Sequence, residues 1–363
     1  MSSGTVPKHL ELVYDDIQRV VEDVGSTLKR LSGKTLLLTG ANGFLASYMA
    51  DTIAWLNDNV FSSPCHLIAL VRTPVKHDGR LGHFLNREDV QFVVQSVSAP
   101  FRLNRHIDFI VHAASRASPK SYLANPLDAM DANVVGTRQL LEIAKEEGVE
   151  SFLFFSSGEI YGEAVDGFIP TPEAYPGNVD CISPRACYTE SKRYGETLCY
   201  IYWREYGVPI KIVRPFHVYG PGLRLDDGRV IADFLRDRLA NESIHVLSDG
   251  SAIRAFCYIS DATTGFWKVL LSDYNGEVFN IGDDREPISI RDLAYLVASF
   301  GDPQLSVIFE ISGLPEYLRG TPSRVCPDIS KARQLLLYCP RIRLREGLIK
   351  TLTWHRARLG GMS

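Results

Sequence analysis

Short continuous runs of apolar residues alternate along this chain with longer segments in which apolar residues recur at helical spacing. An uninterrupted apolar run is typical of a strand buried on both faces of a parallel sheet, whereas spacings of three and four residues are typical of an amphipathic helix. The predicted strands cover residues 34–39, 66–71, 108–111, 151–155 and 208–215. Because helical segments lie between them, the pattern predicts an α/β fold with a doubly wound parallel sheet.

Two further regions flank this alternation, which spans residues 34–215. Residues 1–33 carry apolar side chains at roughly helical spacing with charges between them, which predicts an N-terminal helical extension of one or two helices packed on the main domain. A break rich in Gly and Pro follows residue 215 and indicates a second, smaller region over 216–363. A segment near 254–281 is expected to return to the first domain.

The first predicted strand runs directly into a glycine turn and then into a helical segment. Strand, glycine turn and helix in this order are the context of a dinucleotide-binding site. Gly40 would make the tight turn, Gly43 would let the backbone approach a diphosphate, and Ala46 would let the helix pack closely on the strand. The free N–H groups and the dipole at the start of the helix favour an anion there. The predicted cofactor contacts of this turn are Gly40, Asn42, Gly43, Phe44 and Leu45.

The residue after the second predicted strand, Arg72, bears on which dinucleotide binds. NAD-selective sites usually end this strand with Asp or Glu, which holds the adenosine ribose, whereas an arginine can pair with the 2′-phosphate of NADP. Arg72 can also stack on adenine or face water. NAD is the expected cofactor and NADP is the alternative. Ala113 and Ala114 follow the third predicted strand, and their small side chains would leave room for the cofactor.

Tyr188 and Lys192 stand four residues apart in a predicted helix, and Ser157 follows the fourth predicted strand. Residues i and i+4 lie on the same helix face, so the ammonium group of Lys192 is expected to lie near the phenol and to lower its pKa. Such a phenol can take a proton from an alcohol while hydride leaves the same carbon. The pair alone also fits a packed tyrosine and a solvated lysine. A serine at the carboxyl end of a buried strand lies at the cofactor crevice, which favours the catalytic interpretation.

Composition and charge narrow the class of protein. The chain has 363 residues, of which 45% are hydrophobic and 23% charged, as in soluble globular proteins. A net charge of −4 provides no basic field for nucleic acid or a membrane surface. The seven cysteines lack metal-ligand spacing, and an odd number fits reduced thiols better than a disulfide framework. No apolar run is long enough to span a bilayer. We therefore expect a cytoplasmic protein with no metal, nucleic-acid or membrane partner.

Several motifs occur in the order found in one known family. They are Gly40, Gly43 and Ala46; His112-Ala113-Ala114; Asn133 with Gly136-Thr137; Ser157 before Tyr161-Gly162; Tyr188 with Lys192; and Arg214-Pro215 before Tyr219-Gly220-Pro221. Together they resemble the extended short-chain dehydrogenase/reductases of the NAD-dependent epimerase/dehydratase family, over about residues 34–354. These enzymes modify nucleotide sugars, and the resemblance implies a Rossmann-type sheet with a smaller nucleotide-sugar-binding region.

Other segments look most like the UDP-glucuronate decarboxylases (UDP-xylose synthases), with the dTDP-glucose 4,6-dehydratases close by. They include Ala117-Ser118-Pro119 with Tyr122 and Asn125-Pro126, Pro184-Arg185-Ala186-Cys187-Tyr188, Asp227-Gly228-Arg229-Val230, Arg254-Ala255-Phe256 and Pro327-Asp328-Ile329. The resemblance implies that Tyr188 takes the proton from the sugar 4-hydroxyl, that Ser157 hydrogen-bonds the same oxygen, and that Lys192 holds the cofactor ribose. It further implies that hydride passes from C4 to NAD, and that the 4-ketone permits elimination, epimerisation or loss of carbon dioxide from a C6 carboxylate.

The resemblance also implies the remaining binding residues. The further cofactor contacts are Ala113, Ala114, Asn133, Tyr188, Lys192 and Pro215, and the substrate contacts are Ser118, Tyr122, Arg185, His217, Arg229 and Arg254. Arg229 and Arg254 are candidate diphosphate clamps, because a guanidinium group binds phosphate in a bidentate way. The alternative for these two is a surface salt bridge. Arg185 and His217 can equally be structural.

The triplet Ser157-Gly158-Glu159 bears on the reaction that follows C4 oxidation. In the 4,6-dehydratases the middle position is an aspartic acid that protonates the departing 6-hydroxyl, and such acid assistance is worth ~10²–10⁴ in rate. Gly158 has no side chain, which disfavours ordinary dehydration, although the decarboxylases usually carry serine there. Glu159 is expected to face C5 of the sugar, as in the family, with a turn-capping carboxylate as the alternative.

Two more departures from the family pattern leave the identity of the substrate nucleotide open. His217 stands where the family has asparagine, and Leu247 stands where it has an aromatic residue. The leading hypothesis is decarboxylation of a nucleoside-diphosphate uronate. The alternatives are a 4-epimerase, a C4 dehydrogenase or an atypical 4,6-dehydratase, and a non-catalytic cofactor-binding protein. The family also implies a homodimer, formed through the helices that carry Tyr188 and Asn133.

Overall fold

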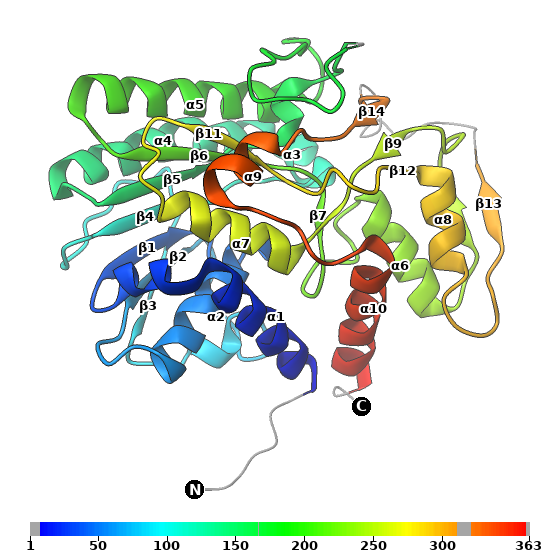
Figure 1. Ribbon diagram of the computed structural model, residues 1–363, viewed down its shortest axis with the longest axis horizontal. Helices are drawn as coiled ribbons and strands as arrows, with labels where there is room; N and C mark the ends of the chain where they lie inside the picture. The colour runs from blue at the N-terminus through cyan, green and yellow to red at the C-terminus, as the bar shows by residue number, and fades with distance from the viewer. Residues whose placement is uncertain (1–7, 166, 311–320, 361–363) are drawn as a thin grey trace, which may run out of the picture.

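A seven-stranded sheet, in the order β11-β6-β5-β4-β1-β2-β3 with every neighbouring pair parallel, forms the centre of the molecule (Figure 1). The computed structural model describes residues 8–165, 167–310 and 321–360. The strands are β1 (Thr35–Thr39), β2 (His66–Val71), β3 (Val90–Val94), β4 (Phe109–His112), β5 (Ser151–Phe155), β6 (Ile210–Pro215) and β11 (Val278–Ile281). The predicted doubly wound parallel sheet and all five predicted strands are confirmed, with bounds shifted by two residues at most.

Helices cover both faces of the sheet because successive strand residues point to opposite sides. Leu36 and Leu38 of β1 pack toward α2 (Phe44–Asn59) and α7 (Ile259–Leu270). Leu37 points the other way, toward α4 (Pro126–Glu147) and α5 (Ala186–Tyr206). In Figure 1, α5 runs along the top of the molecule, and α1 and α2 lie lower, near the N-terminus. Strands buried on both faces explain why the apolar runs are continuous.

The described N-terminal residues form α1 (Lys8–Val24) followed by the 3₁₀ helix η1 (Gly25–Leu31); residues 1–7 of the expected extension over 1–33 lie outside the described part. The buried apolar positions of α1 face α7, α2 and α10. Asp16 is fully buried among them and pairs with Lys350 Nζ at 2.9 Å. The Tyr258 hydroxyl donates to the same carboxylate at 2.7 Å. These contacts tie α1 to the core, although burial raises the pKa of Asp16.

The smaller region lies beside the carboxyl ends of the sheet strands. It contains β7 (Val218–Tyr219), α6 (Val230–Ala240), β8 (Ile244–Val246), β9 (Ile253–Arg254), β10 (Cys257–Tyr258), β12 (Ile288–Ser289), α8 (Ile290–Ala298), β13 (Val307–Phe309), β14 (Arg324–Val325) and α10 (Leu344–Gly360). The helix α9 (Ser330–Leu336) packs instead on β11 and α7 of the large sheet. The short elements between the sheet strands are η2 (Gly82–Phe84), α3 (Pro119–Ala124) and η3 (Gly158–Tyr161). Between β10 and β12 the chain returns to the large sheet. There α7 covers one face of the sheet and β11 pairs with β6.

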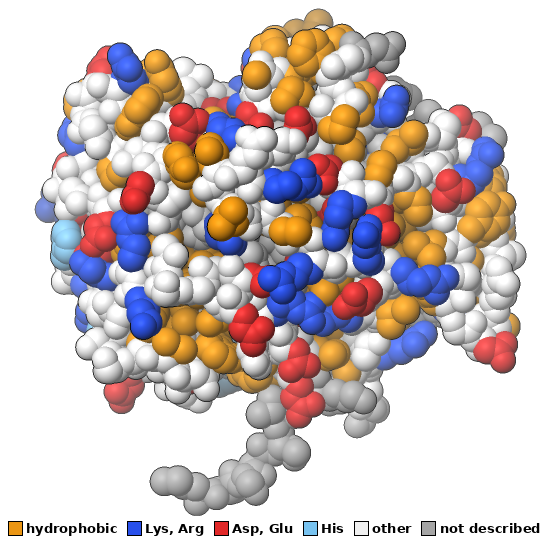
Figure 2. Space-filling view, in the orientation of Figure 1, with side chains coloured by type: hydrophobic (Ala, Val, Ile, Leu, Met, Phe, Trp, Pro, Cys, Tyr) orange, Lys and Arg blue, Asp and Glu red, His pale blue; other side chains and the backbone are white. Residues whose placement is uncertain are grey.

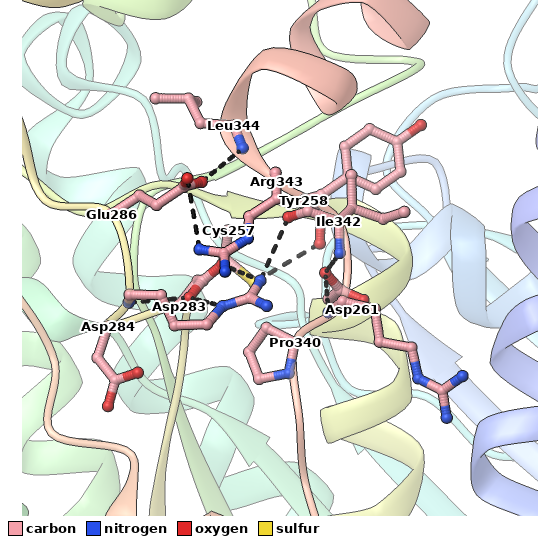
Figure 3. A network of polar contacts seen from close by, with 12 residues as sticks. Cys257, Tyr258, Asp261, Asp283, Asp284, Glu286, Pro340, Ile342, Arg343 and Leu344 are labelled. Carbon is pink, nitrogen blue, oxygen red and sulfur yellow. Dashed lines mark hydrogen bonds and ion pairs between the residues drawn. The ribbon is translucent and has the colours of Figure 1, made fainter.

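A network of polar contacts attaches the start of α10 to α7 and to the loop after β11 (Figure 3). The Asp261 carboxylate accepts hydrogen bonds from the main-chain N–H groups of Arg341 and Ile342 at 3.0 and 2.9 Å. Glu286 accepts from the N–H of Leu344 at 3.0 Å. Burial raises the pKa of Asp261 to about 6. The two regions are therefore joined by hydrogen bonds as well as by the chain itself.

Acidic and basic side chains are interspersed on the face shown in Figure 2, with apolar patches between them. All seven cysteines are free, as their odd number indicated. Across residues 8–165, 167–310 and 321–360, no helix is long and apolar enough to cross a membrane. Within the same ranges, no group of His, Cys, Asp or Glu side chains is placed to hold a metal ion.

Candidate active site

A cavity of about 380 Å³ opens at the carboxyl ends of the sheet strands and extends to the smaller region. It is lined by residues that follow β1 and β4, between which the strand order reverses, and this is the usual ligand crevice of a doubly wound sheet. Most of the predicted site residues line it. These are Gly40, Asn42, Gly43, Phe44, Leu45, Arg72, Ala113, Ser118, Ser157, Glu159, Arg185, Tyr188, Lys192, Pro215, His217, Arg229 and Arg254. Residues from five strand ends therefore meet in one place.

The glycine turn after β1 has the geometry that a dinucleotide requires. Gly40 has φ +66°, and a Cβ there would lie 2.7 Å from the Cα of Ala114. A Cβ on Gly43 would lie 2.9 Å from the Gly40 carbonyl oxygen. The start of α2 lines one end of the cavity, and no side chain accepts a hydrogen bond from its first N–H groups. A diphosphate fits this cradle, because backbone can approach it closely and the helix N-terminus favours an anion.

A buried histidine supports the turn from beneath. His112 Nδ1 lies 2.9 Å from the Thr39 hydroxyl and Nε2 lies 3.0 Å from the Thr137 hydroxyl. Burial lowers the pKa of His112 to about 3, so the ring is neutral. It ties β1, β4 and α4 together under the crevice. This explains why His112 belongs to the motif although it does not line the cavity.

Ser157, Tyr188 and Lys192 meet where β5 ends beside α5. Ser157 and Tyr188 are joined by a side-chain hydrogen bond. Lys192 is 2% exposed, and its Nζ donates to the carbonyl of Phe155 at 2.6 Å. The ring of Tyr188 stacks on Tyr122 with centroids 5.1 Å apart. The three predicted groups are therefore brought together, with the phenol fixed by packing.

The predicted lowering of the Tyr188 pKa by Lys192 is wrong for this structure. The pKa of Tyr188 is raised to about 12, chiefly by burial and secondly by the negative charge of Glu159. The hydrogen bond to Ser157 lowers it, but by less. Burial also lowers the pKa of Lys192 to about 7. Helix spacing predicted that the two residues share a face, but burial is the largest influence on the pKa of each.

Glu159 and Arg185 form an ion pair in the same cavity, with Glu159 Oε2 2.6 Å from Arg185 Nη2. The N–H of Glu159 donates to the Ser157 hydroxyl at 3.2 Å, so Ser157, and not the carboxylate, caps the η3 turn. Gly158 lies between them and is buried. A Cβ on Gly158 would lie 3.0 Å from ring atoms of Phe216. The aromatic ring therefore occupies the space that a side chain at position 158 would enter.

Arg229 and Arg254 line the part of the cavity next to the smaller region. Arg229 Nε pairs with Asp227 at 3.1 Å. Arg254 is 5% exposed and donates to main-chain oxygens, among them that of Ile253 at 2.7 Å. Arg254 forms no ion pair with any described residue, so the surface salt bridge considered from sequence is wrong for Arg254. Burial lowers its pKa to about 10. A buried guanidinium group without a carboxylate partner favours an anionic ligand.

His217 lies next to these arginines with φ +36°, a conformation that asparagine adopts more readily. Burial, followed by the charges of Arg254, Arg229 and Arg185, holds the pKa of His217 well below its ordinary value. The ring is therefore neutral. Its buried Nε2 has no hydrogen-bond partner among the described residues. A neutral ring nitrogen that faces three cations can serve a ligand as donor or acceptor.

Three predicted contacts do not line the cavity. Ala114 packs behind the glycine turn, and Tyr122 lies behind the ring of Tyr188. Asn133 is buried in α4 and donates to the Ser191 hydroxyl at 2.9 Å, which supports α5. The cavity also contains residues that the sequence reading missed, namely Arg80, Ser115, Arg116, Ser121, Ser156, Leu223, Arg224, Asp227, Thr321, Pro322 and Val325. Most come from loops, where no periodicity marks the side of the chain that faces the site.

A doubly wound sheet, a glycine turn at the start of α2, and a Ser, Tyr and Lys group in the same cavity define a dinucleotide-dependent enzyme of the short-chain dehydrogenase/reductase class. Residues 36–282 match the NAD dependent epimerase/dehydratase family, and the chain belongs to this family. This confirms the predicted family, and the family description agrees with NAD as the predicted cofactor.

Curated relatives and solved structures agree with this assignment. The chain is 33% identical to UDP-glucuronic acid decarboxylase 1 of Xenopus tropicalis, over 90% of this chain and 73% of the relative. It is 32% identical to UDP-glucuronic acid decarboxylase 5 of Arabidopsis thaliana, over 91% of each chain. The crystal structure of UDP-glucuronic acid 4-epimerase from Bacillus cereus, in complex with UDP-glucuronic acid and NAD, superposes with a TM-score of 0.75. That alignment has 26% identity and covers 89% of this chain and 99% of the epimerase.

Proposed function

We propose that this protein binds NAD, oxidises the C4 hydroxyl of a nucleotide-linked sugar and then decarboxylates a nucleoside-diphosphate uronate. The observation that carries the proposal is a wall of three arginines, Arg185, Arg229 and Arg254, in the same cavity as Ser157 and Tyr188, with two carboxylates, Glu159 and Asp227, against three guanidinium groups. Arg185 and Arg229 lie close enough to Tyr188 to lower its pKa electrostatically. A uronate brings two kinds of anion to such a wall, a diphosphate and a C6 carboxylate. The named decarboxylase relatives support the same reaction.

The chain's own residues then have separate tasks. Tyr188 accepts the proton of the C4 hydroxyl, and Ser157 holds that oxygen through a hydrogen bond. Lys192 is fixed by the Phe155 carbonyl and reaches the cofactor ribose from there. Bound NAD would supply the hydride acceptor and would return the hydride after carbon dioxide has left. Arg185 holds the carboxylate end of the sugar, and Glu159 positions Arg185.

The binding of the substrate is divided between the two regions. Arg229 and Arg254 come from the smaller region and would clamp the diphosphate, while Ser118 and His217 border the sugar. The dinucleotide lies on residues 34–215. Tyr122 acts by holding Tyr188 through ring stacking, and Asn133 acts by holding α5. The first region would thus bind cofactor and the second mainly nucleotide sugar.

A 4-epimerase is the second candidate, because Gly158 carries neither the serine of the decarboxylases nor the acid of the dehydratases. The superposition on a uronate 4-epimerase supports this alternative. Both candidates share C4 oxidation by Tyr188 and differ in what the 4-ketone does next.

Incubation of the purified protein with UDP-glucuronate and NAD tests the proposal directly. Mass spectrometry of the nucleotide products should detect a UDP-pentose, together with carbon dioxide. A product of unchanged mass but altered C4 configuration would favour the epimerase instead. If a panel of nucleotide uronates yields neither, decarboxylation is refuted.

The rate of C4 oxidation should rise with pH from 7 to 9. A phenol with a pKa of about 12 is protonated throughout this range. The phenolate fraction therefore increases about tenfold per pH unit. Single-turnover formation of the reduced nicotinamide, followed by absorbance, measures the rate, and circular dichroism at each pH checks that the protein stays folded. A rate that is level above pH 7 would contradict a raised pKa in the working enzyme.

We also propose that the chain forms a homodimer through α4 and α5, which pack against each other. Large apolar side chains are exposed on these helices, including Leu127 (75%) and Ile201 (38%). Such side chains are expected to be covered by a partner. Sedimentation at micromolar concentration is the test, and a monomer would contradict the proposal.

A further inference from the structure

A second cavity, of about 730 Å³, is lined by residues of α1, α2 and α10. It is larger than the active-site cavity and falls within the ~300–1,000 Å³ that is usual for ligand pockets. Figure 1 shows the start of α1 and the end of α10 close together, and these two helices are in contact. Further lining residues come from the segment between β2 and β3 and from the segment after β7. The proposed function gives this cavity no occupant.

Two guanidinium groups line the second cavity, those of Arg80 and Arg358, and neither forms an ion pair with a described carboxylate. Arg358 Nη2 donates to the main-chain oxygen of Asp78 at 3.0 Å, and Arg80 Nη2 donates to that of Gly222. The pKa of Arg80 is lowered to about 10, chiefly by burial and to a lesser extent by the positive charge of Arg358, so the two cations lie near each other. Each guanidinium group has five N–H donors, which leaves donors for a ligand.

The carboxylates of the second cavity are engaged elsewhere or exposed. Asp51 of α2 pairs with His83, whose Nε2 lies 2.8 Å from Asp51 Oδ1. Asp78 is exposed, and its hydrogen bond with Arg358 uses the main-chain oxygen. Burial, followed by the positive charges of Arg358 and His83, lowers the pKa of His9, which also lines the cavity. Basic groups therefore face one another here, and an anion would relieve their repulsion.

Apolar side chains form much of the remaining lining, namely Leu10, Val13, Pro221, Trp354 and Ala357. The guanidinium carbon of Arg358 lies 5.3 Å from the centre of the Trp354 ring. The indole N–H of Trp354 is buried and has no hydrogen-bond partner among the described residues. A buried donor of this kind normally has an acceptor. Apolar surface beside cations and an unpaired donor fits a ligand that has both an apolar body and an anionic group.

We propose that the second cavity is a binding site for an organic anion that carries one phosphate, sulfonate or carboxylate group on an apolar or aromatic body. Arg358 and Arg80 hold the anionic group, because guanidinium groups bind such oxygens in a bidentate way. The apolar body lies against α1 and the ring of Trp354. This site does not depend on the sugar reaction, so a failure of the proposed function would leave it standing.

The probe is anilinonaphthalenesulfonate, a fluorescent organic anion, titrated into the full-length protein in excess NAD. The wild type should bind it with enhanced fluorescence. Arg358→Gln should raise its Kd about tenfold to a hundredfold, because a charge-assisted contact is lost. Arg358 is the better choice for this change because Arg80 also lines the active-site cavity. Ala357→Phe should abolish binding by filling the cavity without any change in charge.

Phenylnaphthylamine, which has the same aromatic groups without the sulfonate, tests the need for an anion. It should bind the wild type more weakly than the sulfonate does, and Arg358→Gln should change its Kd by less than about threefold. An equal loss of both probes in Arg358→Gln would overturn the anion specificity that we propose.

Arg356→Gln is the matched control, because Arg356 lies on the same helix with an exposed side chain that does not line the cavity. It removes the same charge and should leave the Kd of the sulfonate unchanged, and circular dichroism checks that each variant is folded. A wild type that does not bind the sulfonate would overturn the proposal. So would binding that survives Ala357→Phe, or equal weakening by Arg356→Gln and Arg358→Gln, since the probe would then bind elsewhere or respond only to overall charge.

Discussion

Tyr188→Phe should lower the rate of C4 oxidation at least about a hundredfold, because proton transfer by a positioned side chain is worth ~10²–10⁴ in rate. The ring is buried and stacked on Tyr122, so phenylalanine keeps the packing and removes only the hydroxyl. The variant should stay folded and should still bind the dinucleotide. Single-turnover reduction of the cofactor with the substrate found by mass spectrometry is the measurement.

Tyr200→Phe provides the control for this change. Tyr200 lies on the same helix, α5, but its side chain is 53% exposed. Its hydroxyl can be removed without touching the cavity, and the rate should be unchanged. A Tyr188→Phe protein that oxidises C4 at the wild-type rate would refute the mechanism. Loss of activity together with loss of dinucleotide binding would instead show that the phenol holds the cofactor.

Gly40→Ala should raise the dissociation constant of the dinucleotide at least about a hundredfold. The new Cβ would lie 2.7 Å from the Cα of Ala114, so β1 and the segment after β4 must move apart. A displacement of about 1 Å in a binding group can cost about 10²-fold. Alanine at φ +66° adds backbone strain of about 1–2 kcal/mol. Fluorescence titration with the reduced cofactor measures the binding, and thermal unfolding measures the strain.

Gly148→Ala separates the two causes. Gly148 ends α4 with φ +64°, and a Cβ there meets no atom within 4 Å. This variant carries the same backbone strain without the steric contact, so it should lose stability and keep normal binding. Equal loss of binding in both variants would show that the close approach at Gly40 is not what shapes the cofactor site.

The fold was predictable from sequence wherever burial is complete. Runs such as Ser151–Phe155 are buried on both sides, and their continuous apolar pattern marks a central strand. The edge strand β3 (Val90–Val94) was missed, because it is only partly buried and its pattern is broken by Gln91. Edge strands satisfy fewer packing requirements, so their sequences are less constrained.

The candidate site was predictable where backbone geometry demands a residue type and less so where side chains meet across loops. Gly40 could be assigned from its turn because only glycine fits there. Arg116 was missed, since its place beside Arg72 depends on a shared contact with Asp128 on a distant helix. The pKa of Tyr188 could not be predicted from spacing alone, because the depth of burial is a property of the assembled protein.

The contact between Gly158 and Phe216 has an evolutionary consequence. A serine or aspartate cannot enter position 158 until the ring, whose atoms would lie 3.0 Å from the new Cβ, has shifted. The order of substitutions then matters. A larger residue at position 158 alone would press against the ring of Phe216, whereas a smaller residue at position 216 alone would leave a cavity beside Gly158. Conversion of this protein toward the chemistry of its relatives would therefore pass through a coupled pair of mutations. Related sequences that carry serine or aspartate at position 158 should therefore also differ from this chain at position 216.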